Sequence, residues 1–321
     1  MKNILVTGGA GFIGSNLVER LLSFENIRKV RVLDNFSTGS RANIEGFIGH
    51  PKFEWVEGDI RDYMTCLTAC EDIDIVSHQA ALGSVPRSIA DPLSTNAVNI
   101  TGTLNIFTAA KETGIKRIIY AASSSTYGDN TELPKLEDRI GKPLSPYAIT
   151  KYVNELYAEV FANLYDMEMI GLRYFNVFGP RQSPNGAYAA VIPLFLKHLF
   201  ANESPVIHGD GSTSRDFTYI ENVLQANSLA LFTENIAAVN QIYNVACGES
   251  TTLNALFKTL QKIMGSDVVP IYSDNRIGNI AHSLADISKI RHLLGYQPTV
   301  NIEAGLQKTA TWFQDKKMKH N

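Results

Sequence analysis

The sequence contains little cysteine, no long apolar run and no large excess of one charge. Its 321 residues include only three cysteines, Cys66, Cys70 and Cys247, whose spacing indicates neither a disulfide framework nor a metal site. No run approaches the ~20 apolar residues of a membrane-spanning helix, and the apolar run at the N-terminus is too short for a signal peptide. The formal net charge of −3 gives no reason to expect nucleic acid or a membrane as a partner. We therefore expect a soluble, cytoplasmic protein without a bound metal.

Short apolar runs that alternate with amphipathic stretches are the main pattern of the chain. The apolar runs predict strands at residues 3–7, 30–34, 53–58, 74–80, 117–123 and 169–175. Helical periodicity predicts helices at residues 12–24, 61–70, 91–114 and 145–165. This regular alternation is typical of a Rossmann-type α/β fold, a doubly wound parallel sheet with helices on both faces.

The alternation ends near Asn176, and loops that contain glycine and proline dominate the rest of the chain. A length of 321 residues with 45% hydrophobic content indicates about two domains. We expect residues 1–175 to form the cofactor domain and residues 176–321 a smaller mixed α/β substrate domain. The run "NQIYNVA" predicts a return to the sheet around residues 218–246.

The stretch "VTGGAGFIG" places Gly8, Gly9, Gly11 and Gly14 between the first strand and the first helix. Such a turn lets the backbone approach a pyrophosphate at the helix N-terminus, although glycines also suit an ordinary tight turn. Asp34 ends the second strand, twenty residues after Gly14. A carboxylate there accepts hydrogen bonds from ribose hydroxyls and repels a 2′-phosphate, so the pattern predicts NAD rather than NADP.

Tyr147 and Lys151 lie four residues apart on a predicted helix and therefore share one face. A tyrosine and a lysine at this spacing can also be an ordinary surface pair. A free tyrosine is a poor base because its pKa is about 10, but a neighbouring lysine cation lowers that pKa. Tyr147 is therefore a candidate to accept a hydroxyl proton while hydride passes to NAD.

The motifs along the chain resemble those of the extended short-chain dehydrogenase/reductases that act on nucleotide sugars. They are "TGGAGFIG", "GDIRD", "HQAA", "SSSTYG", "YAITK", "LRYFNVFGPR" and "STSRDFTYIENV", and they run in order nearly from end to end. The pair "AALGSVPRS" and "AASSSTYGD" more narrowly resembles bacterial UDP-N-acetylhexosamine 4-epimerases. The resemblance implies that NAD is held by Gly8, Gly11, Phe12, Ile13, Gly14, Asp34, Asn35, Thr38, Gly39, Asp59, Ile60, Gln79, Ala80, Ala81, Tyr147, Lys151 and Val177.

The same resemblance assigns the chemistry to a Ser/Thr, a Tyr and a Lys, here Ser123, Tyr147 and Lys151. Related dehydratases carry an Asp-Glu pair after their threonine, and uronate decarboxylases carry a glutamate there. This chain has Ser124 and Ser125, which are either sugar contacts or turn residues. Hydroxyls hold a sugar without supplying a second proton-transfer group, which suits reversible oxidation at one carbon.

For the UDP-sugar, the resemblance implies contacts from Ser84, Ser124, Ser125, Asn176, Ala190, Val191, Arg215, Arg276 and Ser283. Ser283 aligns with a position whose side-chain size limits the 2-substituent of the sugar, and a small serine admits N-acetyl. The ordinary alternatives are ion pairs for both arginines and a helix cap for Ser283. Arg87 either approaches the C6 substituent or forms a structural ion pair. The usual aspartate after "RxG" is Asn279 here.

Together these patterns predict a UDP-N-acetylglucosamine/UDP-N-acetylgalactosamine 4-epimerase, acting also on the uronic acid forms, with tightly bound NAD. A UDP-glucose or UDP-glucuronate 4-epimerase is the alternative enzyme. A non-catalytic NAD-binding regulator is the alternative from another class, but such proteins commonly lose the tyrosine. By analogy with relatives, a homodimer is expected through helices near residues 92–113 and 146–166.

Overall fold

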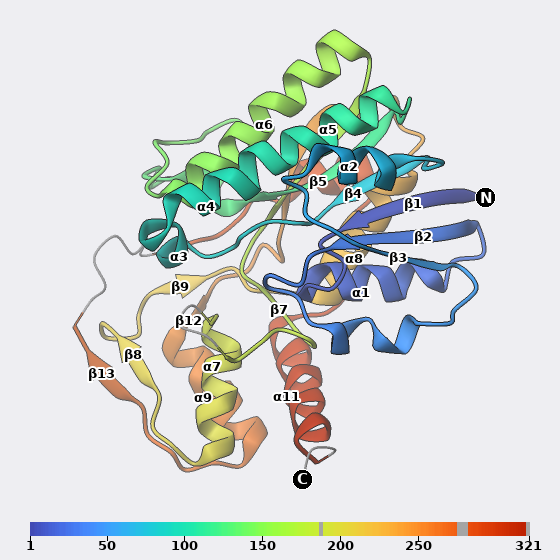
Figure 1. Cartoon of the computed structure of the whole chain (residues 1–321). Coiled ribbons are helices and arrows are strands. Elements are labelled where there is room, and N and C mark those ends of the chain that lie inside the picture. The colour runs from blue at the N-terminus through green and yellow to red at the C-terminus, as the bar shows by residue number, and fades with distance from the viewer. Residues whose placement is uncertain (186–188, 275–281, 319–321) are drawn as a thin grey trace.

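The computed structural model describes residues 1–185, 189–274 and 282–318 of the chain. Its centre is a seven-stranded sheet in the order β11-β6-β5-β4-β1-β2-β3, in which every neighbouring pair is parallel (Figure 1). The strands are β1 (Lys2–Thr7), β2 (Ile27–Asp34), β3 (Phe53–Glu57), β4 (Ile75–His78), β5 (Arg117–Ser123), β6 (Glu168–Tyr174) and β11 (Gln241–Val245). The predicted doubly wound parallel sheet is confirmed. Its strand order reverses between β1 and β4, which is where such sheets bind their ligands.

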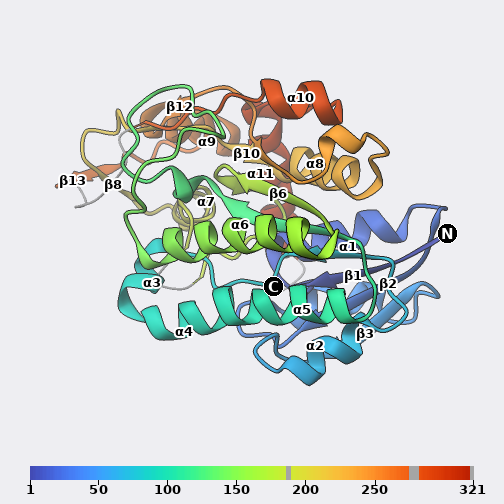
Figure 2. The same ribbon diagram turned by 90° about the horizontal axis from the view of Figure 1, so that it is seen from above.

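Helices cover both faces of the sheet because its central strands are buried on both sides. On one face lie α2 (Tyr63–Cys70), α5 (Thr103–Glu112) and α6 (Pro146–Tyr165), and on the other α1 (Phe12–Leu22) and α8 (Ile220–Phe232) (Figures 1 and 2). Under α5 and α6, the ring of Phe107 meets those of Tyr120 and Phe161 edge-on, at centroid distances of 5.8 and 5.6 Å. Among the described residues, no helix is long and apolar enough to cross a bilayer.

The helix predicted over residues 91–114 is interrupted, so that prediction is wrong in one detail. It consists of α4 (Pro92–Asn96), a π-helical segment (Ala97–Gly102) and then α5. The wider π turn contains Asn99, whose buried amide accepts from the Leu82 N–H at 2.7 Å and donates to the Leu82 carbonyl at 3.1 Å. It also donates to the Thr150 hydroxyl on α6 at 3.1 Å. The interruption therefore joins the loop after β4 to the helix that carries Tyr147 and Lys151.

The remaining elements lie mainly beyond the edge of the sheet at which its strands end (Figure 1). They are α3 (Val85–Ala90), α7 (Val191–Ala201), α9 (Leu253–Met264), α10 (Ser288–Leu294), α11 (Ile302–Met318), the two-stranded pairs β7 (Val177–Phe178) with β10 (Thr218–Tyr219), β9 (Ser214–Arg215) with β12 (Thr251–Thr252) and β8 (Val206–His208) with β13 (Ile271–Ser273), and the 3-10 turns η1 (Arg41–Asn43), η2 (Glu45–Phe47), η4 (Ser124–Tyr127) and η5 (Ile236–Ala238).

A fully buried carboxylate, Asp216, ties three of these segments together. Its oxygens accept hydrogen bonds from the backbone N–H groups of Cys247 at 3.0 Å, Gly248 at 3.0 Å and Ala285 at 3.3 Å. Burial raises the pKa of Asp216 to about 6, against the opposing effect of these donors. The Asn176 amide in turn donates to the Asp216 carbonyl at 2.8 Å. Asp216 thereby sets the position of the neighbouring Arg215.

Candidate active site

The turn between β1 and α1 is built so that only glycine fits at two of its positions. Gly8 has a left-handed φ of +70°, and a Cβ there would lie 2.7 Å from the backbone nitrogen of Ala80. A Cβ on Gly14 would lie 2.1 Å from the Gly8 carbonyl oxygen. The bare backbone leaves room for a pyrophosphate at the start of α1, where free N–H groups favour negative charge. The turn therefore fits a dinucleotide.

Asp34 closes this turn from the end of β2. One carboxylate oxygen accepts from the Ala10 N–H at 2.9 Å, and the other accepts from the Phe36 N–H at 2.8 Å. Burial raises the pKa of Asp34 from its ordinary value, and these backbone donors oppose that shift. Each oxygen keeps a further lone pair, so the carboxylate can accept two more hydrogen bonds from a ribose.

A cavity of about 280 Å³ lies over this turn and is lined by most of the residues expected to hold NAD. These are Gly8, Gly11, Phe12, Ile13, Gly14, Asp34, Asn35, Thr38, Asp59, Ile60, Gln79, Ala80 and Ala81. Gly39 lines a neighbouring cavity instead, and Tyr147, Lys151 and Val177 are not part of this lining. Leu33, Ser37, Gly58, Gly83 and Val98 also line it and were not predicted. The one feature of the sequence that could have identified these five residues is that they lie close to the predicted motifs.

The candidate catalytic residues come from two adjacent elements, β5 and α6. Ser123 ends β5, and Tyr147 lies in the first turn of α6, whose N-cap Ser145 accepts from the Ala148 N–H at 3.1 Å. Lys151, one turn further, is 3% exposed and donates its ammonium to the Ala121 carbonyl at 2.8 Å. Its Nζ lies 6.0 Å from the centre of the Tyr147 ring. The structure therefore brings the three predicted residues together.

The electrostatics of this trio depend on burial. Burial lowers the pKa of Lys151 to about 8, so the amine still carries a charge at neutral pH. Burial also raises the pKa of Tyr147, whereas a hydrogen bond from Ser123 lowers it. A lowering effect means that the Ser123 hydroxyl stabilises the phenolate. The net pKa of Tyr147 is raised, so its side chain is a protonated phenol at neutral pH, and Ser123 is placed to stabilise the phenolate once it forms.

The opening of η4 shows which way the Ser123 hydroxyl points. Its oxygen is the acceptor for the Ser125 N–H at 3.2 Å and lies 2.9 Å from the Ser125 hydroxyl. With its lone pairs used by Ser125, Ser123 has its own proton left to donate toward Tyr147. Ser125 is thereby engaged in the turn, and Ser124 is half-buried beside it.

His78, behind Lys151, was not predicted to have a role although its motif was noticed. Nδ1 lies 2.7 Å from the Thr7 hydroxyl and Nε2 lies 2.9 Å from the Thr103 hydroxyl. Because Thr103 donates to the Asn99 carbonyl at 2.7 Å, it accepts from Nε2–H, and Thr7 donates to Nδ1. Burial, together with the charge of Lys151, lowers the pKa of His78 to about 3. His78 is therefore neutral, with one assigned tautomer.

The residues expected at the sugar lie on several loops. Ser84 has a φ of +92° and begins α3, and Asn176 has a φ of +37°, both unusual for residues with a side chain. Ala190 and Val191 begin α7. The Ser283 N–H donates to the Ser214 carbonyl at 3.1 Å, which places Ser283 next to Arg215. Burial lowers the pKa of Arg215. Arg276 and Asn279 lie outside the described residues.

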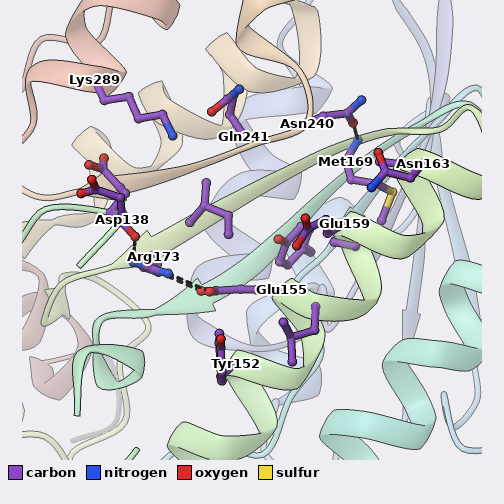
Figure 3. A pocket seen from close by; sticks show the side chains of 16 residues that line it. Asp138, Tyr152, Glu155, Glu159, Asn163, Met169, Arg173, Asn240, Gln241 and Lys289 are labelled. Atoms are coloured by element: carbon purple, nitrogen blue, oxygen red, sulfur yellow. Dashed lines mark hydrogen bonds and ion pairs between the residues drawn. The ribbon is translucent and has the colours of Figure 1, made fainter. Parts of the chain in front are cut away.

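A buried ion pair joins α6 to the sheet one turn beyond Lys151. The guanidinium of Arg173 donates to both oxygens of Glu155, at 2.8 and 2.7 Å, and to the Glu137 carbonyl at 2.9 Å (Figure 3). Both side chains are almost fully buried, with exposed fractions of 2% and 3%. The carboxylate of Glu155 raises the pKa of Lys151, which opposes the effect of burial. Periodicity alone gave no sign of this pair, because its members are eighteen residues apart.

Comparison with known proteins gives consistent matches over nearly the whole chain. Residues 4–246 match the model of the NAD dependent epimerase/dehydratase family. A putative UDP-glucose 4-epimerase of Methanocaldococcus jannaschii is 38% identical over 97% of this chain and 98% of its own. The structure of the UDP-N-acetylglucosamine 4-epimerase from Methanobrevibacter ruminantium M1, in complex with UDP-N-acetylmuramic acid, is 41% identical, with a TM-score of 0.92 over 98% and 99% of the two chains. That of the Thermotoga maritima UDP-glucose 4-epimerase with UDP-glucose is 37% identical, with a TM-score of 0.91 over 98% and 99%.

These matches confirm the resemblance inferred from the motifs. The family model spans the turn at Gly8, the strand that ends in Ser123 and the helix of Tyr147 and Lys151. The chain is therefore a member of the NAD-dependent epimerase/dehydratase family, alongside UDP-sugar 4-epimerases.

Proposed function

We propose that this protein interconverts UDP-N-acetylglucosamine and UDP-N-acetylgalactosamine at C4, and acts also on their uronic acid forms. The observation that carries the proposal is the Ser123–Tyr147–Lys151 arrangement beside a turn of hydroxyl residues, Ser124 and Ser125, without a second acid–base group. The similarity to a UDP-N-acetylglucosamine 4-epimerase supports the N-acetyl preference. An intact tyrosine argues against a non-catalytic NAD-binding regulator.

The proposed mechanism uses this chain's residues to move one proton. When bound, NAD supplies the acceptor and donor of hydride for C4 of the sugar. Tyr147 takes the proton of the 4-hydroxyl as C4 is oxidised and returns it after the sugar has turned over. Ser123 stabilises the phenolate form of Tyr147 by its hydrogen bond, and the ammonium of Lys151, 6.0 Å from the centre of the ring, would add to that stabilisation. No other proton donor is needed, because each proton that leaves O4 returns to O4.

We also propose a division of labour along the chain. Residues 1–175 would hold NAD through the turn at Gly8 and through Asp34. Residues 176–321, apart from the segment within 218–246 that returns to the sheet as α8 and β11, would hold the UDP part of the substrate, while Ser84, Ser124 and Ser125 of the first part would meet the sugar. Arg215 and the N-terminus of α7 would meet the diphosphate, since both favour negative charge. Ser283, beside Arg215, would face the 2-substituent.

A homodimer is the proposed assembly. On α6, Ile149, Leu156, Val160 and Leu164 are 50%, 45%, 46% and 69% exposed, and their spacing of seven, four and four residues puts them on one face. Exposed apolar side chains in such a row are typical of a contact with another chain. The proposed partner is a second copy of this chain, packed helix to helix.

The test of function is a comparison of substrates. Purified protein, without added reductant, is incubated separately with UDP-N-acetylglucosamine, its uronic acid form, UDP-glucose and UDP-glucuronate. We expect the 4-epimer of the N-acetylated sugars to form with the highest kcat/KM. If UDP-glucose or UDP-glucuronate is turned over more efficiently than both N-acetylated sugars, the proposed substrate is wrong. If none is turned over by NAD-loaded protein, the proposed reaction is wrong as well.

A further inference from the structure

A larger cavity, of about 690 Å³, adjoins the cavity that we assign to NAD. Its walls come from the segment after β2, the segment of residues 181–185, the C-terminal half of α7, and α11. Phe12 and Thr38 line both cavities, so one wall is shared. The volume falls within the range of small-molecule sites in proteins. We refer to it as the α7–α11 cavity.

The α7–α11 cavity is basic and aromatic. Arg181, Lys197 and Lys316 line it, and no carboxylate side chain occurs among the described residues of its lining. Four aromatic rings line it as well, those of Phe12, Phe200, Trp312 and Phe313. Polar groups for a ring edge or a sugar are supplied by Thr38, Ser40, Asn43, Gln182, Ser183 and Asn185. This combination suits a ligand that carries both an aromatic ring and negative charge.

The cations of the cavity are not equivalent. Arg181 pairs with Glu19 at 2.8 Å and donates to the Ser15 carbonyl at 3.1 Å, so its charge is largely used within the protein. Lys197 is exposed, and among the described residues its amine has one hydrogen-bond contact, a long one of 3.5 Å with the Asn185 amide oxygen. The Lys316 amine lies 5.0 Å from the centre of the Trp312 ring. Lys197 is therefore the cation best placed to meet an incoming anion, close to an aromatic surface.

The cavity is distinct from the proposed UDP-sugar site because the two lie at opposite ends of α7. Ala190 and Val191, at the proposed UDP site, begin this helix, whereas Lys197, Phe200 and Ala201, in the cavity, are near its end. At 1.5 Å per residue, the ends of α7 are about 15 Å apart. A single mononucleotide at one end does not fill the other.

We propose that the α7–α11 cavity binds a second ligand of nucleotide type. Its base would stack on Trp312, as bases do on aromatic side chains, and its phosphate would meet Lys197 in a charge-assisted contact. Because Phe12 and Thr38 belong to both cavities, the ligand would also restrain one wall of the NAD cavity and slow the release of NAD. The concentration of free nucleotide would thus set how long the protein retains its NAD.

The test uses the full-length, NAD-loaded protein with AMP as the probe. The chain has two tryptophans, Trp55 and Trp312, so Trp55→Phe leaves Trp312 as the only indole reporter. UDP is kept at saturating concentration to fill the substrate site. We expect AMP to change Trp312 fluorescence saturably at micromolar to low millimolar concentration, and to slow NAD release at least twofold.

Two variants decide the assignment. Lys197→Glu should weaken AMP binding at least tenfold. Lys258→Glu, the same change at an exposed position of α9, should leave AMP binding unchanged. Absence of a saturable signal up to 10 mM AMP, or equal binding by both variants, overturns the proposal. If inorganic phosphate competes as well as AMP does, the cavity recognises negative charge without a base. That result would exclude a nucleotide ligand.

Discussion

Lys151 and His78 are two basic side chains at one buried site, but only one of them carries a charge at neutral pH. The pKa of Lys151 falls only to about 8, since Glu155 opposes burial, whereas that of His78 falls to about 3. At neutral pH the lysine is therefore mostly charged and the histidine is neutral. A single cation beside Tyr147 can stabilise one phenolate. A protonated His78 would repel the Lys151 ammonium, so the two do not carry charge together.

Tyr147→Phe should fold and retain NAD but lose nearly all turnover. The phenylalanine ring occupies the same space, while the hydroxyl proposed to accept the O4 proton is gone. General acid–base groups contribute ~10²–10⁴-fold to rate, so we expect a loss of that size in kcat. The measurement is kcat on NAD-loaded protein, with bound NAD determined by absorbance after denaturation. A decrease smaller than about threefold would rule out Tyr147 as the proton acceptor.

His78 should make the protein sensitive to acid. Its pKa is lowered from 6.5 to about 3 in the folded state, so its stabilising effect is present above pH 6.5 and is lost as pH falls toward 3. Between pH 7 and pH 5 this linkage amounts to about 2 kcal/mol of unfolding free energy. His78→Gln should lack that part of the pH dependence. Urea unfolding of both proteins at the two pH values measures it, and identical pH dependence would contradict the neutral assignment.

Ser283→Tyr should discriminate between sugars. A tyrosine at Ser283 would occupy the space proposed for the acetamido group, and overpacking costs about 1–3 kcal/mol, or roughly 5- to 150-fold in kcat/KM. UDP-glucose lacks that group and should be affected little. The quantity to measure is the ratio of kcat/KM for UDP-N-acetylglucosamine to that for UDP-glucose in each protein. An unchanged ratio in folded, NAD-loaded variant would show that Ser283 does not limit the 2-substituent.

For single residues, the sequence predicted a role best where the local structure accepts only one type of residue. Gly8 and Gly14 are required by backbone contacts, and Asp34 lies at a set distance from them. His78 and Asn99 could not be assigned in this way. Their partners, Thr7 and Leu82, are brought to them only by the folded sheet and by the π turn.

Helix α6 carries both the proposed catalytic residues and one member of a buried ion pair. In consecutive turns it presents Tyr147, Lys151 and Glu155, and the last of these is held against β6 by Arg173. In Figure 3 the pair lies above Tyr152, with Glu159 beside Glu155 and Lys289 near the top of the view. The ion pair therefore anchors the helix that carries Tyr147, the proposed proton acceptor.

Arg173→Met should destabilise the protein by about 3–5 kcal/mol, because it leaves the buried Glu155 carboxylate without its partner. Adding Glu155→Leu should recover most of that loss, since replacing both members of a buried pair by apolar residues is often nearly neutral. Lys308→Met, which breaks the exposed pair with Glu221, should cost less than about 1 kcal/mol. Chemical unfolding measures all three. No recovery in the double variant would contradict an electrostatic role for the pair.

Element prediction succeeded where the hydrophobic period was long and uniform, as in the strands of the sheet and in α6. It failed within residues 91–114, where the chain stays helical but changes to a π-helix at Ala97–Gly102, a change that the apolar pattern did not reveal. The short pairs β7–β10 and β9–β12 carry two residues per strand and are too brief for a period. They form because distant segments meet around Asp216.

For the whole molecule, the proposed dimer can be tested directly. Leu156→Glu combined with Val160→Glu places charges on the exposed apolar face of α6. We expect wild type to sediment as twice the 35.4 kDa chain, and this variant to sediment as a monomer. Thr259→Glu on α9 is the matched control. A monomeric wild type, or a variant that remains dimeric, would show that this face is not the interface.

The strand order also has a consequence for how the chain is made. Within the described residues, the edge of β6 that faces away from β5 pairs with β11, and synthesis must proceed from Tyr174 to Val245 before that strand exists. At ~5–20 residues per second, this interval is roughly 4–14 s. Throughout it, a nascent chain on the ribosome presents an open strand edge, a template for pairing with other chains. A chaperone that shields this edge during translation would therefore raise the yield of folded protein.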